Sequence, residues 1–136
     1  MPAAGEVYRA YVDAESRRDD DAMRELLAPD ISIELNGRPA LGSAEEDAAA
    51  MRALFDLYPD YRREIVEIID DGDRVAARWR MVGQPRPDMT GTLPPLDIRG
   101  CTFAVVEAGR MVSAYVWSPA GIIEELLATV PTDPGS

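Results

Sequence analysis

Residues 61–117 decide the fold, because they contain two strand–turn–strand units in succession. The first unit, residues 61–82, reads YRREIVEIIDDGDRVAARWRMV, and the second, residues 98–117, reads IRGCTFAVVEAGRMVSAYVW. Asp71-Gly72 and Ala108-Gly109 supply tight turns between runs rich in Val, Ile and aromatic residues. Four strands joined in this way predict an antiparallel meander.

Helical patterns lie on both sides of this meander. Ser43 followed by Glu46 is a capping box, which marks the start of a helix. Pro119 occupies a favoured first position of a closing helix that carries Ile122, Ile123, Leu126 and Leu127. In order, we expect a helix over residues 5–18, a short helix capped by Asp19–Asp21 that ends at Pro29, a strand over 31–35, a turn at Asn36-Gly37, a helix from Ser43 to Tyr58, strands over 61–70, 74–82, 98–107 and 110–117, and the closing helix.

This order of elements predicts an α+β fold, in which a curved antiparallel sheet packs against the N-terminal helices and a C-terminal helix closes it. We expect one domain over residues 1–130 and a flexible tail over 131–136. A sheet that curls around helices encloses an interior able to hold a small organic molecule. The long Pro- and Gly-rich connection over residues 83–95 is typical of the rim of a site.

Composition excludes several classes of function. The 136 residues carry 14 Lys and Arg against 25 Asp and Glu, a net charge of −11 that disfavours nucleic acid and anionic membranes as partners. There is no histidine and only one cysteine, Cys101, so we expect neither a metal site nor a disulfide framework. No cofactor-binding fingerprint is present, and without a leader or a membrane span we expect a cytoplasmic protein.

Several short strings, in order along the chain, resemble the SnoaL-like family of the nuclear-transport-factor-2-like superfamily. They are Leu27-Ala28-Pro29-Asp30, Tyr58-Pro59-Asp60, Gly72-Asp73-Arg74-Val75 before Arg78-Trp79, Gly91-Thr92-Leu93-Pro94-Pro95, and Gly109-Arg110-Met111-Val112. The resemblance covers roughly residues 7–127. It implies a cone-shaped fold that is commonly homodimeric, and it implies activities such as polyketide cyclisation, dehydration and isomerisation.

The residues expected to do chemistry in such a family are missing from this chain. The resemblance places a catalytic aspartate at Val116 and a histidine at Thr102, and two further histidine positions fall on Glu34 and Pro85. A slip of one residue in the last strand would instead turn Tyr115 or Trp117 into the cavity. We therefore expect the chain to keep the cavity of this family and to lack the family's usual catalytic residues.

Strand alternation predicts the wall of the cavity. If Val116 and Thr102 face inward, so do Ala114, Ala104, Gly100 and Ile98, which form a small and mostly apolar surface. The first strand leaves two alternatives: Ile31, Ile33 and Leu35 face the core, or Glu34 and Asn36 line the site. A carboxyl group enclosed there could serve as a general acid or base.

We therefore predict a cofactor-independent cyclase or isomerase that acts on a hydrophobic, polyketide-like intermediate, with a non-catalytic binding or carrier protein as the alternative. The expected partners are such a small molecule and a second copy of the chain. Glu34 and Tyr115 are the predicted catalytic residues. The predicted substrate contacts are Asn36, Trp79, Asp88, Ile98, Gly100, Thr102, Val116 and Trp117.

Overall fold

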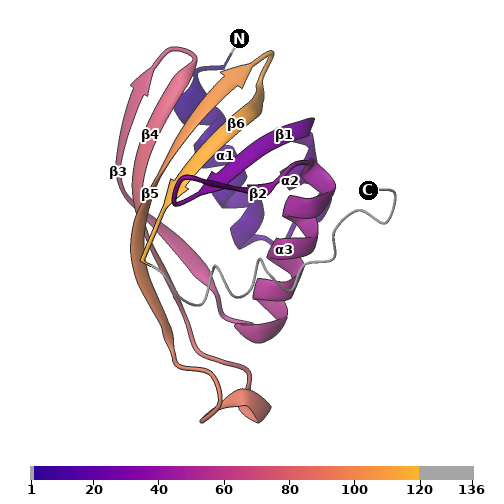
Figure 1. The fold of residues 1–136 in the computed structure, drawn as a ribbon, viewed down its shortest axis with the longest axis vertical. Coiled ribbons are helices and arrows are strands. Elements are labelled where there is room, and N and C mark those ends of the chain that lie inside the picture. The colour runs from indigo at the N-terminus through magenta and orange to yellow at the C-terminus, as the bar shows by residue number, and fades with distance from the viewer. Residues whose placement is uncertain (1, 120–136) are drawn as a thin grey trace.

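A curved sheet wraps around helices that lie on its concave side (Figure 1). The computed structural model describes residues 2–119, and it confirms the predicted α+β class. Within these residues, no helix is long and apolar enough to cross a membrane. The elements are α1 (Ala4–Ser16), α2 (Asp20–Glu25), β1 (Leu27–Leu35), β2 (Arg38–Leu41), α3 (Ala44–Leu57), β3 (Arg62–Asp71), β4 (Arg74–Gly83), the 3-10 turn η1 (Pro87–Met89), β5 (Leu96–Glu107) and β6 (Arg110–Trp117).

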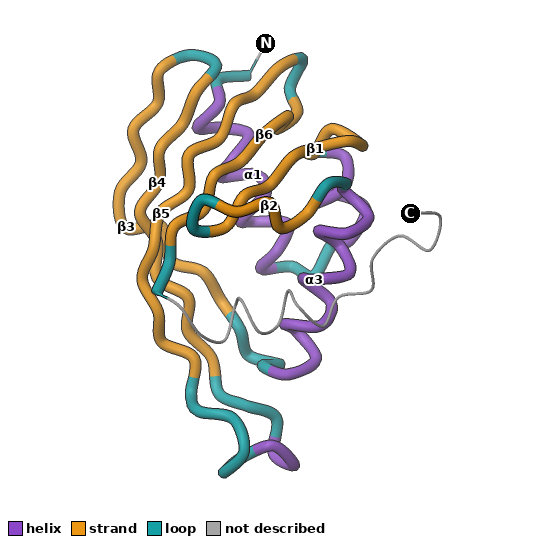
Figure 2. Tube along the Cα trace, in the orientation of Figure 1, coloured by secondary structure: helices purple, strands orange, loops and turns teal. Residues whose placement is uncertain are grey.

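The six strands form one sheet in the order β2-β1-β6-β5-β4-β3 (Figure 2). The predicted meander β3-β4-β5-β6 is confirmed, and each of its pairs is antiparallel. One pairing differs from the predicted antiparallel sheet, because β1 runs parallel to β6. The chain reaches the far edge of the sheet through α3 and then meanders back, so β6 meets β1 in the same direction.

The helix cap at Ser43 and two of the tight turns lie where the sequence predicts them. Asn36 and Gly37 both have positive φ, as do Ala108 and Gly109, which is the backbone of a tight hairpin turn. The β3–β4 ladder extends to the Asp71–Arg74 pair, so that turn lies one residue later than predicted. Ser43 Oγ accepts a hydrogen bond from the backbone N–H of Glu46 at 3.0 Å and caps α3.

One strand was not predicted, and two predicted segments lie outside the described residues. The edge strand β2 was missed, because it has only four residues and contains Pro39, which a strand tolerates at an edge. The predicted closing helix lies, apart from Pro119 itself, outside the described residues, as does the predicted tail over 131–136.

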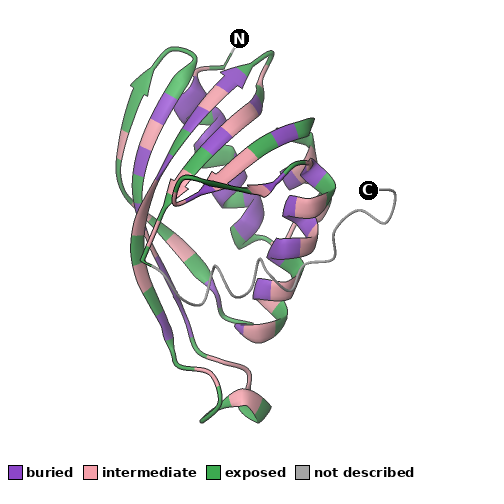
Figure 3. Cartoon of the chain, in the orientation of Figure 1, coloured by how far each residue is buried: buried purple, intermediate pink, exposed green. Residues whose placement is uncertain are grey.

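The core lies between the concave face of the sheet and the helices, and exposed residues gather on the convex face (Figure 3). Trp79 of β4 is 1% exposed and stands on the concave face opposite Gly100 of β5. A Cβ atom at Gly100 would lie 2.6 Å from Cη2 of Trp79 and 2.4 Å from the carbonyl oxygen of Trp117. Glycine is therefore required there, so that the indole can lie flat against the sheet.

Candidate functional site

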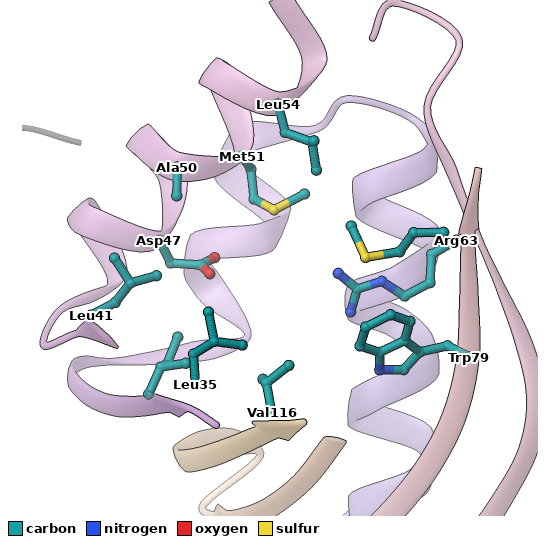
Figure 4. A pocket seen from close by; sticks show the side chains of 11 residues that line it. Leu35, Leu41, Asp47, Ala50, Met51, Leu54, Arg63, Trp79 and Val116 are labelled. Atoms are coloured by element: carbon teal, nitrogen blue, oxygen red, sulfur yellow. The ribbon is translucent and has the colours of Figure 1, made fainter. Parts of the chain in front are cut away.

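Two adjoining cavities of about 100 and 90 Å³ lie between the concave face of the sheet and helices α1 and α3. Both cavities are lined by Ile33, Asp47, Met51, Arg63 and Val116, so they are lobes of one site. Together they are at least as large as an apolar cavity that holds a single aromatic ring. Figure 4 looks into the larger lobe.

The walls of this site are mainly apolar. Strand β1 contributes Ile33 and Leu35, and α3 contributes Ala50, Met51 and Leu54. The alternation of β1 thus places its Ile and Leu side chains inward, which decides between the two alternatives left open by the sequence. On β6 it is Val116 that faces the cavity, so the one-residue slip does not occur.

Asp47 projects from α3 into this apolar site (Figure 4). The residue is only 8% exposed, and the hydroxyl of Tyr11 donates a hydrogen bond of 2.5 Å to its Oδ2. Burial raises the pKa of Asp47 from 3.8 to about 6, and the hydrogen bond from Tyr11 partly opposes this rise. A carboxyl group with such a pKa can take up and release a proton near neutral pH.

Arg63 projects into the same site from β3, on the side opposite Asp47 (Figure 4). Its guanidinium carbon lies 5.1 Å from the centre of the Trp79 ring, and Nη1 donates a hydrogen bond of 3.2 Å to the hydroxyl of Tyr8. Burial lowers the pKa of Arg63, but Glu15 together with Tyr61, Tyr8 and Tyr11 outweighs this effect, and the pKa lies well above its usual value. Arg63 is therefore a permanent buried cation in the wall of the cavity.

Glu15 of α1 forms an ion pair with Arg63 and holds its guanidinium in place. It is 1% exposed, its Oε1 lies 3.4 Å from Nε of Arg63, and Oε1 also accepts a hydrogen bond of 2.9 Å from Tyr61. Oε2 of Glu15 is buried and has no hydrogen-bond partner among residues 2–119. Burial raises the pKa of this carboxyl above its usual value, and Arg63, Tyr61 and Arg18 offset only part of this rise.

Three of the predicted contact residues line the site. Trp79 and Val116 face the larger lobe, and Thr102 and Val116 face the smaller one. Nε1 of Trp79 donates a hydrogen bond of 2.9 Å to Oγ1 of Thr102, which satisfies the buried indole. Ile98 and Gly100 lie on the same face of β5, where they pack against the core and against Trp79.

The two predicted catalytic residues lie elsewhere. Glu34 and Tyr115 are neighbours across the β1–β6 pair, and both alternate with residues that face the cavity. Tyr115 is 41% exposed, so the two side chains stand on the convex face of the sheet. Trp117, predicted as a contact, occupies the same face. The cavity geometry gives these three assignments no support.

The remaining predicted contacts also lie away from the cavity. Asn36 forms the β1–β2 turn, where its Oδ1 accepts a hydrogen bond of 3.0 Å from the backbone N–H of Ser118. Asp88 lies in η1 at the far end of the β4–β5 hairpin and pairs with Arg86 at 2.9 Å. Their positions suit a turn and an exposed loop. Their predicted roles in binding therefore have no support from the geometry.

Sequence reasoning missed Asp47, Arg63, Glu15 and Tyr11. A signal for them existed, because charged residues interrupt apolar stripes. Asp47 precedes Met51 and Leu54 at helical spacing, and Glu15 follows Tyr8 and Tyr11 in the same way. A charged side chain on a buried stripe is either paired or functional.

Comparisons with known proteins agree with the observed fold. A family model of the SnoaL-like domain matches residues 8–114. Among solved structures, IdmH from Streptomyces antibioticus, a candidate polyketide cyclase, has a TM-score of 0.75 at 22% identity and covers 93% of this chain and 99% of that chain. AclR from Streptomyces galilaeus, a candidate hydroxylase, has a TM-score of 0.73 at 19% identity and covers 96% of this chain and 84% of that chain.

A candidate ketosteroid isomerase from Kribbella flavida is also similar, with a TM-score of 0.65 at 18% identity over 86% of this chain and 78% of that chain. No curated protein matches this chain. At these identities the solved structures establish the shared fold, and the different activities in their names leave the reaction to be argued from the site.

Proposed function

The chain belongs to the SnoaL-like family, and from this premise we propose that it is a cofactor-independent enzyme of the cyclase or isomerase type. Its substrate is an apolar natural-product intermediate of the polyketide kind. Asp47 is the group that moves the proton. The observation that carries this proposal is a single carboxyl group among the described lining residues, with its pKa raised by burial to about 6, in a mainly apolar cavity.

The surroundings of Asp47 suit a general base. The apolar walls exclude water, so the carboxylate is poorly solvated and reacts readily with a weakly acidic C–H group. Tyr11 fixes the orientation of the carboxyl through Oδ2, while Oδ1 accepts no hydrogen bond from residues 2–119. That second oxygen is the one available to a substrate.

The chain needs this group because it lacks the family pair expected at Val116 and Thr102. Both positions line the cavity, but neither side chain can transfer a proton at neutral pH. We therefore assign proton transfer to Asp47, and the predicted catalytic roles of Glu34 and Tyr115 serve as the competing hypothesis.

The test is the Asp47→Asn variant, which keeps the volume of the side chain and its ability to accept from Tyr11. Turnover is followed by product analysis with a panel of polyketide-like intermediates, and by exchange of deuterium next to the carbonyl group of cyclic ketones. We expect kcat to fall by about 10²- to 10⁴-fold. In the parent, kcat/KM should rise with pH through about 6, because the charged carboxylate is the base.

Glu34→Gln is the matched control, since it removes one carboxylate from the other face of the same sheet. It should leave kcat within about twofold of the parent. A loss of turnover in Glu34→Gln with full turnover in Asp47→Asn would reverse the assignment.

The alternative is a carrier that binds the same class of molecule without converting it. The missing Asp and His at Val116 and Thr102 favour it. An enzyme and a carrier both predict that ligands raise the melting temperature. They differ in product formation, and a parent protein that is stabilised by ligands yet yields no product or exchange would favour the carrier.

We also propose that the protein is a cytoplasmic homodimer that pairs through the convex face of the sheet. Phe103, Tyr115 and Trp117 are 52%, 41% and 49% exposed on this face, an unusual concentration of aromatic surface for a monomer. Sedimentation of Trp117→Ser tests the dimer. A dimer as stable as that of the parent would place the interface elsewhere.

A further inference from the structure

We propose that Arg63 forms a subsite for a negatively charged ligand oxygen, so that the ligand is an enolisable carbonyl compound or a phenol held as its enolate or phenolate. The formation of an enolate by Asp47 rests on the proposed function. The binding of the anion does not, because it requires no turnover.

The hydrogen bonds of Arg63 leave donors for a ligand. A guanidinium carries five N–H groups. Nε donates to the hydroxyl of Tyr61 and Nη1 donates to the hydroxyl of Tyr8, both at 3.2 Å. Among residues 2–119, Nη2 has no acceptor, and the side chain lines both lobes of the cavity. The fork is thus turned toward the space that a ligand would occupy (Figure 4).

The guanidinium is held rigidly before any ligand arrives. Glu15 lies behind it at 3.4 Å, and the ring of Trp79 lies beneath it. Groups fixed in this way need no reorganisation when charge develops on a ligand, and this makes them effective in an apolar site. The Arg63 side chain is 13% exposed, so water competes weakly for its donors.

The charges around Arg63 are balanced for such a ligand. The groups that face it are Glu15, Tyr8 and Tyr11 from α1, Asp47 from α3, Tyr61 before β3, and Trp79 from β4. Arg63 compensates for one negative charge at Glu15. A second negative charge resides on Asp47 when that group is ionised, and proton transfer can pass this charge to the ligand.

The carboxylate of Asp47 takes the proton from the carbon next to a carbonyl group, and the C–H electron pair forms a C=C bond. The C=O π pair moves to the oxygen, which becomes an enolate held by Arg63. Protonated Asp47 then returns the proton to another carbon in an isomerisation, or to the alkoxide that forms when the enolate carbon attacks a second carbonyl. The total charge in the cavity is unchanged throughout.

The probe is 4-nitrophenol, which fits a ring-sized cavity and whose anion is yellow. We expect the parent to bind the anion in preference to the neutral phenol, so that the bound probe is coloured at a pH where the free probe is largely colourless. 4-Nitrotoluene, which is similar in size and cannot ionise, reports whether the cavity is intact.

The key variant is Glu15→Gln/Arg63→Gln, in which both buried charges are removed together so that neither is left unpaired. We expect its affinity for the anion to fall by about 10- to 100-fold, and its affinity for 4-nitrotoluene to stay within about threefold. Arg80→Gln is the matched control, because Arg80 belongs to the convex face and pairs with Asp97 at 2.8 Å. It should bind both probes like the parent.

Asp47→Asn separates this inference from the proposed function. Removal of a neighbouring negative charge should tighten binding of the anion several-fold at pH 8, while it abolishes proton transfer. If no ketone is turned over but the anion binds through Arg63, the proposed function fails and this inference stands.

Three results would overturn the inference. The parent could bind 4-nitrophenol in its neutral form, it could bind neither probe, or the double variant could bind the anion as tightly as the parent. Should the double variant fail to fold, the colour of the probe bound to the parent decides alone.

Discussion

Residues of the same type have opposite surroundings on the two faces of the sheet. On the concave face, Arg63 is 13% exposed and is held by tyrosines and a buried carboxylate. On the convex face, Arg80 is 36% exposed and pairs with a solvated Asp97. The concave pair is screened little by water and the convex pair strongly, so similar contacts differ in their importance for stability and chemistry.

The difference between the two faces shows where reactive groups can arise in this fold. Burial raises the pKa of a carboxyl group only where water is excluded, and among the described residues the two carboxyls raised in this way, Asp47 and Glu15, lie on the concave side of the sheet. Asp47 acquires a pKa of about 6 in this way.

The largest effect should come from Arg63→Met, compared with Arg80→Met. Loss of Arg63 leaves Glu15 buried without its cation, so we expect unfolding by denaturant to show a loss of about 3–5 kcal/mol. Loss of Arg80 should cost about 0–1 kcal/mol, since its pair is exposed. Equal losses in the two variants would remove the distinction between the faces.

Asp47→Asn should make the protein more stable above pH 6. Burial raises the pKa of Asp47 from 3.8 to about 6, so the native state binds this proton more tightly than the unfolded chain. The parent therefore loses stability as the pH rises from about 4 to about 6, by at most about 3 kcal/mol. Asn does not titrate.

Denaturation midpoints at pH 4 and pH 7.5 check this expectation. The advantage of Asp47→Asn over the parent should grow between the two pH values. Tyr11 faces the carboxyl from α1, Glu15 and Asp20 add negative charge, and Arg63 adds positive charge, so these groups set the size of the gain. An advantage that is constant with pH would mean that Asp47 does not titrate in this range.

Thr102→Val tests the polar contact at the centre of the concave wall. The substitution preserves volume but leaves Nε1 of Trp79 buried without an acceptor, so thermal or chemical denaturation should show a loss of about 1–3 kcal/mol. Ser at the same position keeps a hydroxyl and should recover part of this loss. A neutral Thr102→Val would show that the indole finds another acceptor.

The smallest effects should come from Glu34→Gln and Tyr115→Phe. Both side chains stand on the convex face, so stability should change by less than about 0.5 kcal/mol. Turnover should also stay near that of the parent. A large loss of kcat in either variant would support the original prediction that these residues are catalytic and would break the division between the faces.

Much of the fold was predictable because its signals are local. Asn36-Gly37 and Ala108-Gly109 form turns from their own backbone preferences, and Ser43 caps a helix from three residues away. The β1–β6 pairing was not predictable in this way, since it joins segments about 80 residues apart and depends on how the whole sheet closes. The short β2 carries too few residues to show a pattern.

The site was predictable only in its apolar part. Alternation correctly placed Thr102 and Val116 on the wall, because the period of a strand is fixed. It could not tell which charged residues are buried. Asp47 and Glu15 lie on apolar helical stripes, but their sequence positions do not show which side chains surround each carboxyl group.

The sequence is sufficient to define most of the helices and strands and the alternation of the strand faces, and it contains no histidine that could take part in a reaction. These follow from local backbone preferences and from composition. Only the packing of the chain brings Asp47 and Arg63 to opposite walls of one cavity and leaves Glu34 and Tyr115 on the convex face of the sheet. The reason is that burial is a collective property: a side chain loses its water only when segments distant in the chain pack around it.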